Sequence, residues 1–418
     1  MNIHIPGRAL FYTLTLILVT TAMTACSSTP KLLGNPEAPY SLPRKPEVGD
    51  ILHTKTGVFV SADAMLETAQ DARVVYVGET HDNPASHRLQ LQTLQALQQR
   101  WPGNVALGME MFTPAQQETL DAWTAGELSE KEFLKRVEWF KVWAMDYDLY
   151  RDLLDYAREH KIPVVGLNVN KELRRKVGRT PLEELDPETR ARLPEMDFND
   201  PYQRGLVEAI YGGHNAGKAM LDGFLRVQTL WDESMAENAA NYLTSDKGQG
   251  KHLLIVAGGN HVRYGFGIPR RLFRRLPLSY VTLGGREIVI PQDKQDRQMD
   301  VTLPKFPFPP YDYLVFTEYE DLPDADNKVK LGIHFEETDE GLEIKKVISG
   351  SAAANAGLQE GDLLTSMDGE LLAERHDLIY PLSLKRRGDI ISLGLQRDGS
   401  ALVLEVTLIP LRMQHPPE

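Results

Sequence analysis

Two histidines that lie far apart in the sequence each follow a short apolar run and close a Gly-x-x-His motif. His81 ends the motif at 78–81, after the run 74–77, and His261 ends the motif at 258–261, after the run 253–257. A β-branched run that stops at glycine predicts a buried strand followed by a turn. In an open parallel sheet, ligands bind beyond the carboxyl ends of the strands. The repeated motif therefore predicts that both imidazoles reach one site, and two separate core or loop histidines are the alternative.

Two glutamates lie close to these predicted strand ends. Glu79 lies inside the first motif, and Glu110 lies between Met109 and Met111 in another apolar run. A buried carboxylate is costly unless it is paired or bound to a metal, although pairing with an arginine or partial solvent exposure would also account for Glu110. Histidines and a carboxylate around an open position could activate water on a divalent ion, with Glu79 or Glu110 as ligand or general base. The candidate metal ligands are His81, His261, Glu79 and Glu110.

Further polar residues belong to the same pattern. Asn168 ends a third apolar run at 163–169. Gln228 and Asp232 are four residues apart and so lie on one face of a predicted helix. Taken alone, Asp232 is expected to be a solvated charge.

The elements between the motifs alternate between strand and helix patterns. Asn83 and Pro84 have the residue types of a helix cap and a first helical position. Apolar stripes predict helices that pack on the sheet through Tyr150, Leu153, Leu154 and Ala157, and through Met220, Phe224, Val227 and Trp231. The fold class predicted is α/β, a mostly parallel sheet covered by helices. The polar stretch 171–217 predicts a helical lobe or lid.

The N-terminus has the pattern of an export signal. Arg8 precedes an apolar stretch at 9–22, and small residues follow up to Cys26, the single cysteine of the chain. Residues 23–26 resemble a bacterial lipobox, which implies that Cys26 carries lipid and that the chain is anchored to a membrane. Ser27, rather than aspartate, favours the bacterial outer membrane by the usual sorting pattern. Residues 1–25 are thus the predicted signal peptide, and residues 26–50 the predicted tether.

Composition and proline content set the remaining boundaries. The net charge of −13 is spread along the chain and argues against a nucleic-acid partner. A proline-rich stretch around 303–310 breaks helix and strand patterns. We therefore expect a main domain at 51–300, a linker at 301–325 and a small domain at 326–412.

The motifs of the main domain, taken together, resemble the ChaN family of haem-binding uptake lipoproteins. The residues that carry the likeness are 75–81, 108–112, 166–168, 231–236 and 258–261. The family belongs to a superfamily with the Tiki metalloproteases and erythromycin esterases, which implies a site for haem or a metal at the strand ends. The leading interpretation is haem binding in iron acquisition, with a homodimer as a further expectation, and the alternative is a metal-dependent hydrolase. The candidate haem-binding residues are His81, His261, His214, Tyr264 and Asn168.

The C-terminal segment resembles a bacterial PDZ domain. Residues 351–358 and 361–369 are similar to its small-residue helix and following strand. The expected carboxylate-binding loop is Leu331, Gly332, Ile333 and His334, although a histidine stands where an apolar residue is common. Such a loop captures a peptide C-terminus, and the adjacent strand accepts the peptide as an added strand. The alternative is a PDZ fold that packs against the main domain and binds no peptide.

Overall fold

The structure is a computed structural model that describes residues 40, 42–143, 145–212, 220–297 and 301–410. The described residues from Arg44 onward form one compact unit. The predicted signal peptide, Cys26, most of the tether and His214 lie outside the described residues. None of the described helices is both long and apolar enough to cross a membrane.

The first domain is built on an eight-stranded sheet, in the order β2-β1-β8-β7-β3-β6-β4-β5. The six strands from β8 to β5 are parallel to one another, and β1 and β2 add an antiparallel edge. The strands are β1 (Ile51–His53), β2 (Val58–Val60), β3 (Val74–Glu79), β4 (Val105–Met109), β5 (Val164–Gly166), β6 (His252–Gly258), β7 (Tyr280–Val289) and β8 (Tyr313–Glu318). The predicted mostly parallel α/β sheet is confirmed.

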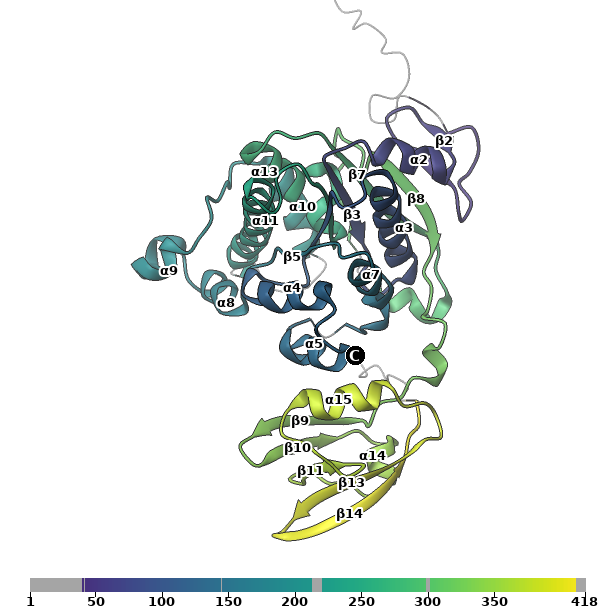
Figure 1. Cartoon of the computed structure of the whole chain (residues 1–418), viewed down its shortest axis with the longest axis vertical. Coiled ribbons are helices and arrows are strands. Elements are labelled where there is room, and N and C mark those ends of the chain that lie inside the picture. The colour runs from purple at the N-terminus through teal and green to yellow at the C-terminus, as the bar shows by residue number, and fades with distance from the viewer. Residues whose placement is uncertain (1–39, 41, 144, 213–219, 298–300, 411–418) are drawn as a thin grey trace, which may run out of the picture. The chain divides into compact units, whose positions relative to one another are not determined.

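Helices cover both faces of this sheet (Figure 1). They are α2 (Ala62–Ala69), α3 (Pro84–Arg100), α4 (Gln117–Ala125), α5 (Glu130–Arg136), α6 (Trp139–Val142), α7 (Asp148–Glu159), α8 (Lys171–Arg179), α9 (Pro187–Ala191), α10 (Pro201–Gly212), α11 (Leu221–Thr244), α12 (Gly259–Val262) and α13 (Ile268–Arg275). Short 3-10 turns are η1 (Pro114–Gln116), η2 (Leu182–Glu184), η4 (Arg263–Gly265), η5 (Gln292–Arg297) and η6 (Ala325–Asn327). The predicted helical lobe corresponds to α8, α9 and α10.

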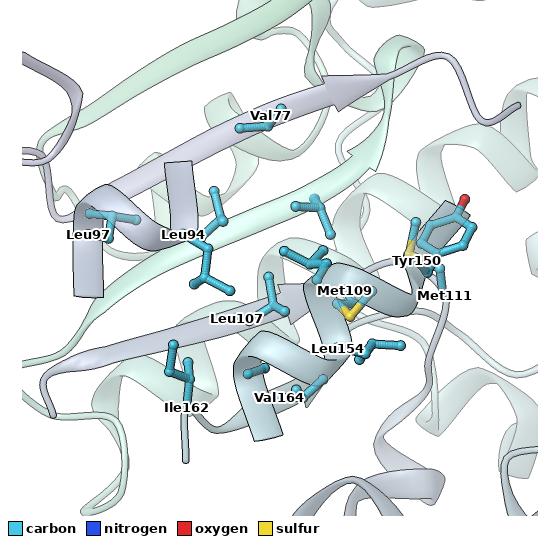
Figure 2. Close-up of a cluster of buried hydrophobic side chains, with 14 of the residues drawn as sticks. Val77, Leu94, Leu97, Leu107, Met109, Met111, Tyr150, Leu154, Ile162 and Val164 are labelled. Carbon is cyan, nitrogen blue, oxygen red and sulfur yellow. The ribbon is translucent and has the colours of Figure 1, made fainter. Parts of the chain in front are cut away.

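Alternation along β3 divides the core into two layers. Val75 and Val77 face the layer that includes α3, α4 and α7, whereas Val74 and Tyr76 face the layer that includes α11 and α13. Figure 2 shows the first layer, where Leu94 of α3 and Leu154 of α7 lie over Leu107 of β4. The strands are buried on both faces, which explains why they read as continuous apolar runs.

The predicted helix signals have mixed outcomes. The Asn83 side chain accepts a hydrogen bond from the Ala85 backbone N–H and caps α3, as predicted. The stripe predicted for α7 is buried, also as predicted. The stripe predicted for α11 is partly right, because Phe224, Val227 and Trp231 lie on the helix and are half-buried. Met220 is the error, since it precedes the helix and is exposed, and the more deeply buried face carries Gln228 and Asp232.

The proline-rich stretch does not act wholly as a linker. Leu303 and Phe306 pack against Leu206 and Ile210 of α10. Residues 313–318 form β8, which pairs with β7 on one side and β1 on the other. The predicted linker at 301–325 is therefore corrected: part of it completes the first sheet.

The C-terminal domain is an antiparallel sheet with its own core. Its strands are β9 (Ile333–Thr338), β10 (Gly341–Val347), β11 (Leu363–Met367), β12 (Glu370–Leu371), β13 (Ile390–Arg397) and β14 (Ser400–Thr407). The order is β14-β13-β11-β10-β9, and β12 pairs with β11. Helices α14 (Ala352–Asn355) and α15 (Arg375–Ser383) complete this domain (Figure 1). Leu378 and Leu382 of α15 contribute to its hydrophobic core.

Candidate functional site

Three neighbouring parallel strands deliver the candidate residues to one edge of the first sheet. β6 lies between β3 and β4, and Glu79 is in register with Gly258. His81 follows β3, Glu110 follows β4, and His261 lies on α12 directly after β6. The structure therefore brings His81, His261, Glu79 and Glu110 together, as parallel strand ends require.

His81 is held by Glu79. Its Nδ1 lies 2.6 Å from Glu79 Oε1, and the Tyr150 hydroxyl donates to the same oxygen at 2.8 Å. The Gln90 amide donates to Glu79 Oε2. Burial alone would lower the pKa of His81, but the hydrogen bond to Glu79 and the charge of that carboxylate raise it to about 9. His81 is thus held as an imidazolium, with about a third of its side chain exposed.

His261 is held between two carboxylates. Its Nδ1 lies 2.6 Å from Asp232 Oδ1, and its Nε2 lies 3.4 Å from Glu110 Oε1. Burial lowers the pKa of His261, but Glu110 and Asp232 together raise it to about 10. Burial raises the pKa of Glu110, but His261, His81 and the Gly258 backbone N–H lower it to about 2. These groups form a buried, charge-compensated cluster.

A close contact explains why the second motif begins with a glycine at position 258. A Cβ atom at Gly258 would lie 2.9 Å from both Cε1 and Nε2 of His81. The His81 ring therefore lies directly against the Gly258 backbone, and a larger residue there would displace it. This contact joins the two Gly-x-x-His motifs to each other.

The alternative of a divalent-metal site is not supported. Across the described residues, no three histidine, cysteine, aspartate or glutamate side chains are arranged to hold a metal ion. Each imidazole Nδ1 instead faces a carboxylate oxygen at 2.6 Å, which is the geometry of separate ion pairs. The arrangement instead suits the storage or transfer of protons at His81, the more exposed of the two.

Several contributors to the cluster were not predicted from the sequence. Asp232 was expected to be a solvated charge but is 1% exposed, because it pairs with His261. Gln228 Nε2 lies 3.0 Å from His261 Nδ1, one helical turn from Asp232. Tyr150 was predicted only to pack on the sheet. The spacing of Gln228 and Asp232 was the one signal that could have found this face of α11.

Asn168 has a supporting position. Its side-chain amide donates to the Glu110 backbone carbonyl at 2.9 Å, and its Oδ1 accepts from the Val169 backbone N–H. It therefore holds the backbone that carries Glu110.

Tyr264 lies among aromatic rings beyond His261. It occupies the left-handed region, with φ of 60°, in η4. Its ring centroid lies 4.8 Å from that of Phe306 and 5.4 Å from that of Phe266. Phe266 stacks on Tyr202, and Tyr202 and Phe308 are 43% and 49% exposed. Burial raises the pKa of Tyr264, whereas the charges of Arg263 and Arg286 act to lower it.

Comparison with protein families decides what this domain is. The model of the family described as haem-binding uptake, Tiki superfamily, ChaN matches residues 65–272. The first domain belongs to the ChaN family. A PDZ-domain model matches residues 329–408, so the C-terminal domain is a PDZ domain. Both predicted resemblances are confirmed.

Individual relatives each match part of this chain. The structure titled cofacial heme binding to ChaN of Campylobacter jejuni is 20% identical, covers 63% of this chain and 95% of that chain, and has a TM-score of 0.49. The periplasmic pH-dependent serine endoprotease DegQ of Escherichia coli is 37% identical over 68 residues, which are 16% of this chain and 15% of DegQ. A serine endoprotease from Yersinia pestis is 24% identical, covers 21% of this chain and 30% of that chain, and has a TM-score of 0.19.

The predicted haem ligands of the ChaN domain differ in how well they fit haem iron. His261 does not fit, because it is buried and both ring nitrogens face carboxylates. In His81, Nδ1 faces Glu79, so only Nε2 is available as a ligand of the iron. Tyr264 fits, because a half-buried phenol among aromatic rings offers an oxygen ligand beside apolar surface, and tyrosine is an established axial ligand.

The PDZ domain places its expected carboxylate loop at the start of β9. Gly332 has φ of +83°, which favours glycine. The carbonyls of Leu331 and Gly332 accept hydrogen bonds from the Ala353 and Ile348 backbone N–H groups. Leu331 and Gly332 are buried, Ile333 is half-buried, and His334 is exposed. Among the described strands, β9 pairs only with β10, so it is an edge strand of its sheet.

Proposed function

We propose that this chain is a membrane-anchored haem-binding protein of the cell envelope that serves iron acquisition. The match of residues 65–272 to a haem-binding family carries the proposal. The surroundings of Tyr264 support it independently, because exposed aromatic rings can cover a porphyrin and a phenol oxygen can bind its iron. Arg263 and Arg286 supply positive charge near Tyr264, which suits the anionic propionates of haem.

The test is an optical titration of the purified chain with haemin. We expect a saturable Soret shift, and Tyr264→Phe should weaken binding by roughly tenfold or more. Tyr156→Phe, a half-buried tyrosine on α7, is the matched control and should bind haemin like the wild type. If His214→Ala abolishes binding while Tyr264→Phe does not, the ligand assignment to Tyr264 is overturned. If no variant and no wild-type sample shifts the Soret band, haem binding itself is wrong.

A homodimer around haem is part of this proposal. Tyr202 and Phe308 leave aromatic surface exposed near Tyr264, and exposed apolar surface of this kind favours association with a second copy of the chain. Sedimentation velocity with and without haemin tests it, and a mass that stays monomeric at saturation contradicts it.

We further propose that the PDZ domain recognises peptide C-termini. The free edge of β9 and the loop at Leu331 and Gly332 support β-strand addition of a peptide with its carboxylate in the loop. An array of peptides with free or amidated C-termini tests this. Binding that needs the free carboxylate supports the proposal, and equal binding of both forms contradicts it.

Anchoring through lipid at Cys26, in the bacterial outer membrane, completes the proposal. The apolar stretch and small residues before Cys26 support processing at that position. Cys26→Ser should release the chain from the membrane fraction or leave it unprocessed. An unchanged distribution and an unchanged mature N-terminus would contradict the anchor.

A further inference from the structure

The PDZ helix α15 presents two faces with different partners. Leu378 and Leu382 point into the core of the PDZ domain. His376 and Tyr380 lie one turn apart and stack on each other with ring centroids 5.3 Å apart. Their face of α15 contacts the ChaN domain instead, where the His376 ring lies 5.8 Å from that of Phe140.

Polar contacts surround this aromatic contact. The Tyr380 hydroxyl donates to Glu130 at 3.4 Å. Lys135 lies 2.6 Å from Glu374 and 3.4 Å from Asp377, at the start of α15. Exposed ion pairs of this kind contribute little energy by themselves. They restrict the orientation of α15, and the buried His376 ring with the half-buried Tyr380 and Phe140 rings adds apolar contact.

All of these ChaN-domain residues belong to one stretch, which we call the bridge segment: residues 130–143 and 145–151. It contains α5, α6 and the first turn of α7. Arg151 pairs with Glu130, so the two ends of the bridge segment are tied together. Lys328, which precedes the PDZ sheet, pairs with Asp146 and lies 2.5 Å from Asp148. The PDZ domain and the residues just before its sheet therefore contact the bridge segment near both of its ends.

The same segment forms one wall of the His81 site. The Trp143 ring meets the His81 ring edge to face, with centroids 5.2 Å apart. Tyr150 donates the hydrogen bond to Glu79 that supports the Glu79–His81 pair. Phe140, which touches the PDZ domain, and Trp143, which touches His81, are only three positions apart in the sequence.

We propose that the PDZ domain regulates the His81 site of the ChaN domain through the bridge segment. A peptide that adds to β9 must lie beside α15, because Arg375 of α15 already covers Phe335 of β9. A shift of α15 then changes its contact with Phe140, and the change passes to Trp143 and Tyr150. By linkage, the peptide and a ligand at the ChaN site must change each other's binding affinity by the same factor. This proposal rests on the proposed function only where it names haem as that ligand.

The first test uses the full chain without haem. The double substitution His376→Ala with Tyr380→Ala removes the rings that α15 presents to Phe140. The readouts are the rate at which diethyl pyrocarbonate modifies His81, located by mass spectrometry, and backbone hydrogen exchange of the bridge segment. We expect both rates to rise by about fivefold or more, the lower range of allosteric couplings.

Two control variants separate coupling from general damage. His376→Phe keeps the ring, and within the described residues neither nitrogen of His376 has a hydrogen-bond partner, so it should behave as the wild type. Val403→Ala changes an exposed residue on β14 and should also leave His81 unchanged. If the double variant fails to fold, Lys135→Glu disturbs the same contact from the ChaN side. The proposal is overturned if α15 exchanges faster in a folded variant while His81 and the bridge segment react as in the wild type.

The second test uses haemin as the probe on the wild-type chain. Saturation with haemin should change hydrogen exchange in residues 374–383 of α15. Binding of haemin without any change in α15 overturns coupling to the haem site. Absence of haemin binding refutes the proposed function, and the His81 reactivity then decides the coupling on its own.

Discussion

His261 Nδ1 lies 2.6 Å from Asp232 Oδ1, although the two residues are 29 positions apart in the sequence. The contact fixes a proton on Nδ1 and turns Nε2 toward Glu110. His81 is arranged in the same way, with Nδ1 on Glu79. Each Gly-x-x-His motif therefore delivers an imidazole that has a carboxylate partner of its own, at neighbouring strand ends.

Asp232→Asn should destabilise the fold strongly. It leaves the His261 imidazolium buried with a weaker partner, and loss of one member of a buried ion pair costs roughly 3–5 kcal/mol. Urea unfolding of the variant measures this loss in the free energy of unfolding. Glu208→Gln is the matched control, because its carboxylate pairs with Arg204 on the surface and should cost well under about 1 kcal/mol. Equal losses in the free energy of unfolding for the two substitutions would show that the buried ion pair contributes no more stability than the surface pair.

The free energy of unfolding should be highest at intermediate pH and should decrease at both higher and lower pH. The pKa of His81 is raised to about 9 and that of His261 to about 10, so their contribution is complete below about pH 6.5 and is lost as the pH rises through 9 and 10. The pKa of Glu110 is lowered to about 2, so its contribution is complete above about pH 4.5 and is lost as the pH falls toward 2.

Urea midpoints measured from pH 3 to pH 10 test this profile, and the same series on Asp232→Asn should show a shallower alkaline decline. A wild-type midpoint that stays constant from about pH 6.5 to 10 would mean that the two histidines are not held as imidazolium groups.

Gly258→Ala should disturb His81 by steric overlap, although it removes no charged or hydrogen-bonding side chain from the cluster. The new methyl group would lie 2.9 Å from two atoms of the His81 ring, so the ring must move away from the strand end. Overpacking of this kind costs about 1–3 kcal/mol. Gly212→Ala is the control, because nothing lies within 4 Å of its added Cβ. Thermal unfolding of both variants measures the difference, and a neutral Gly258→Ala would mean that the His81 ring does not depend on this contact.

The sequence predicted the strand ends better than it predicted the helix faces. A β-branched run before glycine specifies a buried strand locally, so His81, Glu110 and His261 could be assigned to one sheet edge without coordinates. Which face of α11 is buried depends on its partners. Phe224, Val227 and Trp231 formed the more apolar stripe, but the face with Gln228 and Asp232 is buried because His261 compensates the charge.

Long-range pairing explains the other errors. The proline-rich residues 303–310 have no regular hydrogen-bonding pattern of their own, yet they lead into β8, which needs both β1 and β7 as partners. A strand of six residues after prolines carries little local signal. Tyr150 is similar, since its stripe predicted burial but not the hydrogen bond to Glu79 on another element.

A fragment that begins at Asp324 and ends at residue 412 should fold alone as the PDZ domain. Its buried residues form a separate core that includes Leu342, Leu364 and Leu393, so its apolar burial does not depend on the ChaN domain. Without Phe140 and Glu130, however, the His376 and Tyr380 rings become exposed. We therefore expect a cooperative melt whose midpoint lies several degrees below that of the PDZ domain in the full chain, since about 1 kcal/mol shifts a domain of this size by roughly 4–8 °C. Calorimetry of the fragment and the full chain measures both midpoints. A fragment that is unfolded at 25 °C would mean that the bridge segment is part of the PDZ core, and an identical midpoint would mean that the ring contacts with α15 contribute no stability.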